Sequence, residues 1–169
     1  MSRREKVEGR CHICGVEGLL SFEHVPPRRA FNCSRGYMLR GEEALRKGLV
    51  DTVRGCGGKQ YQGGHGDYTL CERCNNNTGS WYGSAYVEWA KQGFDILLKT
   101  GGKPFLYHTF RLYPLQVIKQ VFCIFLSING LGFRDKNPEI VRFVLDKSRV
   151  GLRQDYKVYA FFCASAFLR

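Results

Sequence analysis

The sequence is short of acidic residues and contains no apolar run long enough to cross a bilayer. Only 15 Asp and Glu residues stand against 26 Lys and Arg in 169 residues, giving a formal charge of +11 and a pI near 9.4. This balance points to a polyanionic partner, most often nucleic acid, although a basic protein without such a partner has the same composition. Hydrophobic residues make up 44% of the chain and include twelve Phe. Such a chain can bury a core and is not a disordered tail.

Two kinds of targeting segment are also missing. The first residues, Met-Ser-Arg-Arg-Glu-Lys, lack the apolar core of a signal peptide. The most apolar stretch, Tyr113 to Ile128, is interrupted by Gln116, Lys119 and Gln120 and is too short for a bilayer crossing. We therefore expect a cytoplasmic protein with no membrane partner, whose eight cysteines are thiols or metal ligands rather than disulfides.

Four of the cysteines form two Cys-x-x-Cys pairs, Cys11 with Cys14 and Cys71 with Cys74. Each pair can place two thiolates on one ion, and Gly15 relieves the tight turn after the first pair. The pattern predicts one tetrahedral zinc site, with unlinked buried or redox-active cysteines as the alternative. The 56 residues between the pairs far exceed the usual spacing in zinc ribbons. This insertion must therefore carry more than metal ligands.

A carboxylate and an imidazole stand side by side after the first pair, as Glu23 and His24. Neighbouring side chains on a strand point to opposite faces, so both reach one ligand only where the backbone bends or the site wraps around it. Pro26 and Pro27 supply that bend because they lack backbone donors and end the strand. We place the chemistry of the protein here, with a capped turn as the alternative interpretation.

Together these pieces resemble the HNH endonuclease family, whose fold is known as ββα-metal. The resemblance covers roughly residues 11–79 and consists of the two cysteine pairs, Glu23-His24-Val25-Pro26, and the Asn75 that follows the last cysteine. It implies a structural zinc on the four cysteines, a catalytic Mg²⁺ or Mn²⁺ on Glu23 and Asn75, and His24 as general base. Asn75 and its neighbours have helix capping as an alternative role.

The sequence departs from the family pattern at two positions. The residue before His24 is Glu23, where Asp is more usual, and the longer side chain would move the metal unless the strand shifts. The family's middle asparagine, which positions the histidine, has no clear counterpart, and the sequence offers Asp67 or His65 in its place.

The chemistry of these residues agrees with the resemblance. Phosphodiester hydrolysis needs an activated water, a cation to neutralise charge growing on phosphate oxygens, and a proton acceptor near neutral pH. An imidazole such as His24 can accept the proton. The oxygens of Glu23 and Asn75 are the hard ligands that Mg²⁺ or Mn²⁺ prefers.

We therefore predict a metal-dependent endonuclease that hydrolyses DNA. Its backbone contacts would come from four basic residues, namely Arg3, Arg4, Arg28 and Arg29. The family resemblance is consistent with restriction, phage defence, recombination or mobile elements. The alternative is a zinc-stabilised nucleic-acid-binding module without catalysis. A third interpretation is that the zinc unit is purely structural and that the apolar C-terminal half of the chain is a surface for binding another protein.

The predicted fold is α+β, with a zinc-stabilised ββα-metal core in residues 1–98 and an appended α/β region in residues 99–169. In the first part we expect strands at 18–22 and 67–70, a short helix at 41–50, and a flexible loop or hairpin tip at 55–66. Cys56 and His65 in that loop are stray metal ligands or simply loop residues. A helix is expected from about Ser80 to Leu98, with a buried side formed by Trp81, Tyr82, Ala85, Trp89 and Phe94.

The second part begins after the linker residues 100–104. We expect a strand at 105–112, a helix from Pro114 to about Ser127 that stops at Asn129-Gly130, and a helix from Pro138 to Asp146 with Ile140, Phe143 and Val144 inward. A final apolar run at 156–168 is expected to be extended. We expect this region to serve in packing, in forming a homodimer or in binding a protein partner.

Overall fold

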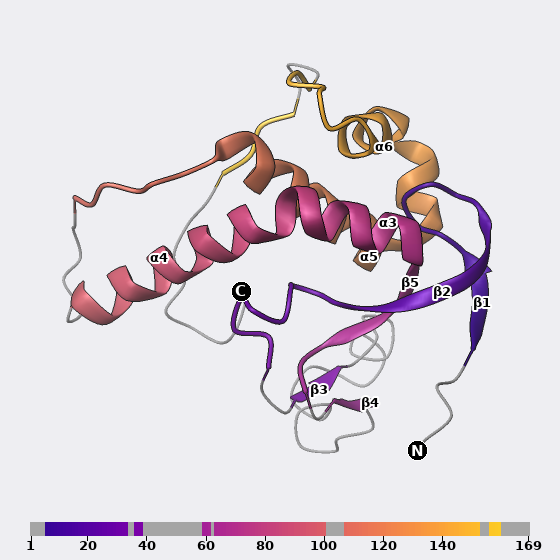
Figure 1. Ribbon diagram of the computed structural model, residues 1–169, viewed down its shortest axis with the longest axis horizontal. Helices are drawn as coiled ribbons and strands as arrows, with labels where there is room; N and C mark the ends of the chain where they lie inside the picture. The colour runs from indigo at the N-terminus through magenta and orange to yellow at the C-terminus, as the bar shows by residue number, and fades with distance from the viewer. Residues whose placement is uncertain are drawn as a thin grey trace, which may run out of the picture.

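The protein is described from a computed structural model that places residues 6–33, 36–38, 59–61, 63–100, 107–152 and 156–159 (Figure 1). Five strands lie in these residues, namely β1 (Val7–Arg10), β2 (Glu17–His24), β3 (Gly36–Met38), β4 (Lys59–Tyr61) and β5 (Gly66–Cys71). The helices there are α3 (Glu72–Thr78), the π-helix η1 (Gly79–Gly83), α4 (Ser84–Thr100), α5 (Pro114–Lys136) and α6 (Pro138–Leu145). The predicted α+β class is confirmed.

The main sheet has three antiparallel strands in the order β1-β2-β5. The predicted strands at 18–22 and 67–70 are its β2 and β5, each slightly longer than expected. In their pairing Leu20 lies opposite Cys71 and His24 lies opposite Gly66, with a register shift between Ser21 and Phe22. The strand β2 ends at His24, two residues before the first proline, as predicted. A second, two-stranded sheet pairs β3 with β4.

One continuous helical segment follows β5, running through α3, η1 and α4 (Figure 1). It begins at Glu72, so the predicted start near Ser80 is wrong. The polar residues that suggested a cap lie inside the helix instead. The Thr78 hydroxyl, for example, donates a hydrogen bond to the Cys74 carbonyl within the helix, at 2.8 Å.

The buried side of this helix differs partly from the prediction. Tyr82 is buried as expected, but Phe94 is 45% exposed, and Val87 and Ile96 are buried instead. At the surface the Phe94 ring packs on Phe31, in the turn after β2, with ring centroids 4.7 Å apart. The other predicted members, Trp81, Ala85 and Trp89, are half-buried.

Residues 107–113 form a coil, so the predicted strand at 105–112 is wrong for its described part. The side chain of Gln92 forms the hydrogen bonds that a neighbouring strand would otherwise form with this backbone. It donates to the Arg111 carbonyl and accepts from the Arg111 amide, both at 2.9 Å. Because a side chain already satisfies both groups, the backbone here needs no sheet partner.

The helix α5 starts at Pro114 as predicted, and its helical backbone is interrupted at the predicted stop, Asn129-Gly130. Gly130 has the non-helical angles φ +72° and ψ −173°, and a second helical stretch continues from there to Lys136. The next helix, α6, agrees with the prediction, and its Ile140, Phe143 and Val144 are all buried. After residue 99 the described chain contains helices and coil but no strand, so the predicted α/β character of this region is not found there.

At its full length α5 could cross a membrane by length and composition alone, with a mean hydropathy of 1.4 over an 18-residue window. The helix is longer than the apolar stretch considered in the sequence because it continues beyond Ile128. Its inner side packs into the protein, however, and the buried residues are Val117, Lys119, Gln120, Phe122, Cys123, Leu126 and Ser127. The buried core helix of a globular protein can have the same length and apolar composition. The length and composition of α5 are therefore only weak evidence for a membrane span.

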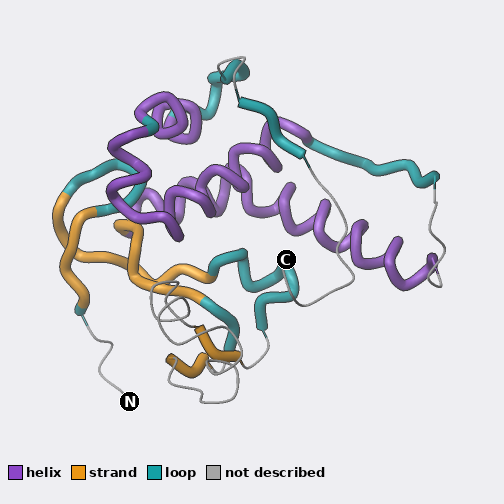
Figure 2. The backbone as a smooth tube through the Cα atoms, turned by 180° about the vertical axis from the view of Figure 1, so that it is seen from behind, coloured by secondary structure: helices purple, strands orange, loops and turns teal. Residues whose placement is uncertain are grey.

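The core joins residues on both sides of the predicted boundary at residue 98. Ile13, from the loop after β1, and Leu70, from β5, pack in one cluster with Phe122 and Leu126 of α5 and with the inner face of α6. Figure 2 shows the strands gathered on one side of the molecule and the helices lying across them. The helical segment α3–η1–α4 and the helix α5 therefore lie together beside the sheet. This arrangement positions the site described next.

The fully buried Lys119 joins α5 to the end of α6. Its Nζ donates to the carbonyls of Asp146 at 2.6 Å and Lys147 at 3.2 Å. The same ammonium lies over the Phe143 ring, 4.9 Å from its centroid. A cation at a helix C-terminus is favourable because the last carbonyls carry partial negative charge.

The remaining predicted elements fall outside the described residues. These are the short helix at 41–50, residues 55–58 and 62 of the predicted loop at 55–66, including Cys56, and the apolar run from residue 160 onward. Within that predicted loop, Lys59–Tyr61 form the strand β4. The first residues of that run, 156–159, are coil rather than strand.

Candidate metal centre and hydrolytic site

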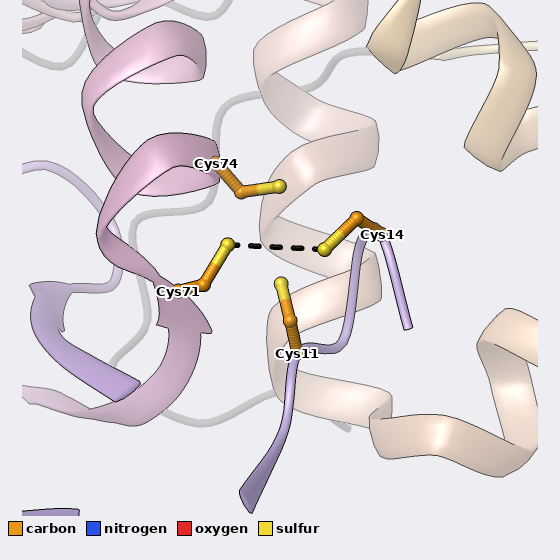
Figure 3. Close-up of side chains that lie close together, drawn as sticks. All are labelled: Cys11, Cys14, Cys71 and Cys74. Atoms are coloured by element: carbon orange, nitrogen blue, oxygen red, sulfur yellow. Dashed lines mark hydrogen bonds between the residues drawn. The ribbon is translucent and has the colours of Figure 1, made fainter. Parts of the chain in front are cut away.

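The four predicted zinc ligands come together in space. The sulfur atoms of Cys11, Cys14, Cys71 and Cys74 all lie within 4.8 Å of one another (Figure 3). In a tetrahedral zinc site with Zn–S bonds of about 2.3 Å, geometry places the sulfurs about 3.8 Å apart. The distance between the Cys14 and Cys71 sulfurs is 3.8 Å. The cluster is therefore compact enough to hold one metal ion such as zinc.

The first cysteine pair is held in a tight turn between β1 and β2. The Gly15 amide donates to the Cys11 carbonyl at 2.9 Å, and Gly15 takes a left-handed φ of +77°, as its predicted role requires. Arg134 of α5 lies against this turn and donates to the carbonyls of Ile13 at 3.2 Å and Cys14 at 3.1 Å. A Cβ at Gly15 would lie 2.4 Å from the guanidinium. The positive φ favours glycine at this position, whereas the flexible Arg134 side chain could shift to make room for a Cβ.

The second pair comes from the junction of β5 and α3. Cys71 is the last residue of β5, and Cys74 lies one turn into α3. The hydrogen bond with Cys74 lowers the pKa of Cys11 to about 4, while the same bond raises the pKa of Cys74. Within this pair Cys11 therefore favours the thiolate, and Cys74 keeps its proton and donates it in the hydrogen bond. A divalent cation is the group that would stabilise all four as thiolates.

Glu23 lies half-buried between the sheet and α5. Its Oε1 accepts hydrogen bonds from the Thr69 hydroxyl of β5 and the Ser127 hydroxyl of α5, which are 2.8 Å from each other. Burial raises the pKa of Glu23 to about 7, and the two hydroxyls oppose that shift. The second oxygen, Oε2, has no hydrogen-bond partner among the described residues. Sequence reasoning missed Thr69 and Ser127, because nothing in the local pattern connects them to Glu23.

His24 projects from the other face of β2, where its ring packs edge-on against Phe22 at 5.1 Å. Its Nε2 lies 3.2 Å from the carbonyl oxygen of Gly63. Since a carbonyl can only accept, Nε2 must carry the hydrogen, which leaves Nδ1 as the proton acceptor of the neutral ring. The backbone of the loop thus selects a tautomer suited to a general base.

Asn75 ties α3 to β2. Its Nδ2 donates to the Ser21 hydroxyl at 3.1 Å and to the Phe22 carbonyl at 3.2 Å. The amide oxygen, Oδ1, has no hydrogen-bond partner in the described part of the chain. Helix capping, the alternative role for this residue, is not found, because Asn75 lies within α3 and the N-cap residue is Cys71.

These three residues line one cavity of about 320 Å³ at the end of β2. Arg28 and Arg29, both exposed, lie on the same cavity. Glu23 and His24 reach it from opposite faces of the strand because β2 ends there, as the prolines predicted. The other two predicted DNA-binding residues, Arg3 and Arg4, lie outside the described residues.

Asn32 is a second residue that sequence reasoning missed. This side chain, only 7% exposed, donates to the carbonyls of Pro26 at 2.6 Å and His65 at 2.7 Å and accepts from the His65 amide at 2.6 Å. It therefore clamps the chain leaving β2 to the chain entering β5. The only sequence signal was an asparagine eight residues after His24.

The residues considered for the family's middle position are placed differently. His65 takes part in the Asn32 clamp through its backbone. Asp67 is exposed and accepts from the amide of its neighbour Tyr68 at 2.9 Å. Neither side chain lines the cavity with Glu23 and His24. The contacts of Asn32 are to the backbone of Pro26 and His65 and do not include His24.

Comparison of the chain with protein-family models, curated proteins and solved structures found no match. The family resemblance described above therefore rests on the residues themselves. The structure adds that Glu23, His24 and Asn75 line one cavity and that Asn75 directly follows Cys74 of the cysteine cluster.

Proposed function

We propose that the protein is a metal-dependent endonuclease with a ββα-metal core that hydrolyses DNA phosphodiester bonds. The observation that carries this proposal is the shared cavity. Two antiparallel strands and the helix after them, β2, β5 and α3, bring a carboxylate, an imidazole and an amide to one place. The adjoining cysteine cluster would bind zinc and fix the start of α3, which carries Asn75.

The free oxygens of the site fit a hard divalent cation. Among the described residues nothing hydrogen-bonds to Glu23 Oε2 or Asn75 Oδ1, while the rest of each side chain is anchored. Carboxylate and amide oxygens suit Mg²⁺ or Mn²⁺, and two protein ligands leave positions for water and phosphate. When bound, such a cation would neutralise charge that develops on the phosphate oxygens.

His24 is the proposed general base. Its Nδ1 would accept a proton from the attacking water, while the hydrogen bond from Nε2 to the Gly63 carbonyl holds the ring and stabilises its protonated form. The Asn32 clamp supports this arrangement because it fixes the loop residues next to Gly63.

The cationic rim suits a phosphate backbone. Arg28 and Arg29 are exposed beside the proposed reacting atoms, and the whole chain carries a formal charge of +11. Contacts of this kind would bind DNA in a salt-dependent and sequence-tolerant manner. A role in restriction or phage defence is part of the same proposal and follows only from the family resemblance.

One observation favours the alternative, a zinc-stabilised nucleic-acid-binding module without catalysis. With a pKa of about 7, Glu23 is partly protonated at neutral pH, and its two hydroxyl partners could give it a purely structural role. This alternative predicts the same zinc and the same affinity for DNA, but no dependence on a second metal.

Nicking of supercoiled plasmid by the zinc-loaded protein separates the two functions. We expect nicked or linear product with Mg²⁺ or Mn²⁺, none with EDTA, and loss of cleavage in Asn75→Ala. Asn76→Ala is the matched control, because Asn76 is exposed on the same helix. Retention of DNA by the wild-type protein without any cleavage would instead favour the non-catalytic module.

A further inference from the structure

The cavity has an inner end that the proposed hydrolysis does not use. Beyond Glu23 and Asn75 it extends between the helical segment and α5, where it is lined by Gly83, Ser84, Val87, Gln120, Cys123 and Ile124. Its volume of about 320 Å³ lies in the size range of small-molecule sites, roughly 300–1,000 Å³. Water and one phosphate group need far less room, so the inner end is available to another part of the substrate.

An unsatisfied acceptor lies in this inner end. Gln120 is only 8% exposed, and its Oε1 is buried with no hydrogen-bond partner among the described residues. A buried acceptor without a donor is costly, and the large majority of such groups in proteins are paired. Gln120 therefore calls for a ligand that brings an N–H or O–H donor.

The space beside Gln120 is open because residue 83 is glycine. A Cβ on Gly83 would meet nothing closer than Gln120 Oε1, at 4.0 Å, so crowding does not require glycine there. Gly83 closes the π-helical turn η1, and such turns frequently occur at functional sites. With Val87 and Ile124 as apolar neighbours, the ligand that fits has apolar surface and a polar edge.

We propose that this inner end binds one unstacked nucleobase of the DNA, an inference that rests on the proposed function. The edge of an unpaired base offers amino or ring N–H donors to Gln120 Oε1, and its faces suit the apolar walls. Its own phosphate would then lie toward Glu23, His24 and the two arginines. A base stacked within a duplex cannot reach this depth. The preferred substrates are therefore bulged, mismatched or single-stranded DNA.

Equilibrium binding in EDTA tests the pocket without cleavage. The probes are a duplex with a single bulged 2-aminopurine, read by its fluorescence, and the same duplex with that base paired. We expect the wild-type protein to bind the bulged duplex at least about fivefold more tightly, as one added hydrogen bond allows. Equal affinity for both duplexes would overturn the proposal.

Three variants localise the effect. Gly83→Leu should fill the inner end and remove the preference for the bulge, whereas Gly83→Ala, whose Cβ fits without a clash, should keep it. Gln120→Met has similar volume without the acceptor, so it should remain folded and lose the preference. Preference retained in Gln120→Met and Gly83→Leu would mean that only water satisfies Gln120, and would overturn the proposal.

Failure of this inference is distinguishable from failure of the proposed function. If the protein prefers the bulged duplex in EDTA but cuts neither duplex with Mg²⁺ or Mn²⁺, the base pocket is supported and the proposed nuclease function is wrong. If it binds both duplexes equally and cuts both equally, the nuclease function is supported and the base pocket is wrong.

Discussion

Ser127 of α5 donates a hydrogen bond to the carboxylate of Glu23 in β2, although 104 residues separate them in the chain. Thr69 donates to the same oxygen, so the two hydroxyls fix one edge of the carboxylate and leave Oε2 for a ligand. The C-terminal part of the chain, for which the sequence predicted only packing, a homodimer or a protein partner, thus contributes a hydrogen bond to the proposed site.

Removing one of these hydroxyls should weaken the proposed catalytic metal site. In Ser127→Ala the carboxylate loses a fixed partner, and loss of such an orienting partner typically costs about 10–100-fold in metal affinity or activity. The measurement is the Mn²⁺ concentration needed for half-maximal plasmid cleavage. Ser80→Ala is the control, because Ser80 is exposed and bonds only to the Asn77 carbonyl. A normal Mn²⁺ requirement in Ser127→Ala would show that Ser127 does not orient Glu23.

Glu23 should make stability depend on pH. Its pKa is about 7 when folded, against an ordinary value of 4.5, so the folded state retains a proton that the unfolded state releases. The stabilising contribution is complete below about pH 4.5 and is lost as pH rises through 7. Relative to Glu23→Gln, the zinc-loaded wild type should lose about 2 kcal/mol of unfolding free energy between pH 5 and pH 8, a figure of the order expected for a shift of this size.

Urea unfolding of both proteins at the two pH values measures this difference. No Mg²⁺ or Mn²⁺ is added, because a bound cation would favour the charged carboxylate. Parallel pH dependences of the wild type and Glu23→Gln would contradict the raised pKa.

Local patterns predicted the parts of the site that depend on short spacing. The Cys-x-x-Cys pairs and Glu23-His24 before the prolines could be recognised from neighbouring residues alone. Ser127, Asn32 and Gln120 could not, because tertiary packing brings them to the site and each looks like an ordinary polar residue in its own segment.

The errors in the predicted elements have similar causes. The helix after β5 begins at Glu72 rather than near Ser80, since the polar residues there bond across to β2 and within the helix instead of capping it. The strand at 105–112 was predicted from its β-forming residues. The Gln92 side chain instead satisfies Arg111, and the residues around it remain coil. Propensity cannot foresee such a partner.

Loss of one zinc ligand should unfold the centre of the protein. Cys74→Ser removes a ligand that is also buried in the core, 2% exposed, so both the metal and the packing are affected. We expect one zinc per wild-type chain, a stoichiometry near zero in the variant, and loss of cooperative unfolding. Cys33→Ser is the control, because Cys33 is exposed and lies outside the cluster. Full zinc content in Cys74→Ser would rule out the Cys₄ site.

The Asn32 clamp should matter for both stability and cleavage. Asn32→Leu removes the side-chain partner of the Pro26 carbonyl and of the His65 amide, while the His65 carbonyl keeps its hydrogen bond from the Val25 amide at 2.9 Å. This loss should cost about 3 kcal/mol. The measurement is the free energy of unfolding from urea titration at constant zinc content. Asn129→Leu, an exposed site with one local hydrogen bond, should change it by less than about 0.5 kcal/mol. Equal effects at the two positions would mean that Asn32 is not a clamp.

The cleavage rate of zinc-replete His24→Ala on supercoiled plasmid with saturating Mg²⁺ or Mn²⁺ tests the proposed chemistry most directly. Removing a general base should lower the rate by about 10²–10⁴-fold. His108→Ala should keep the wild-type rate, because His108 is exposed and its Nδ1 bonds only to the neighbouring Thr109 carbonyl. If His24→Ala cuts as fast as the wild type with its zinc intact, His24 is not the base and the proposed hydrolytic site is wrong.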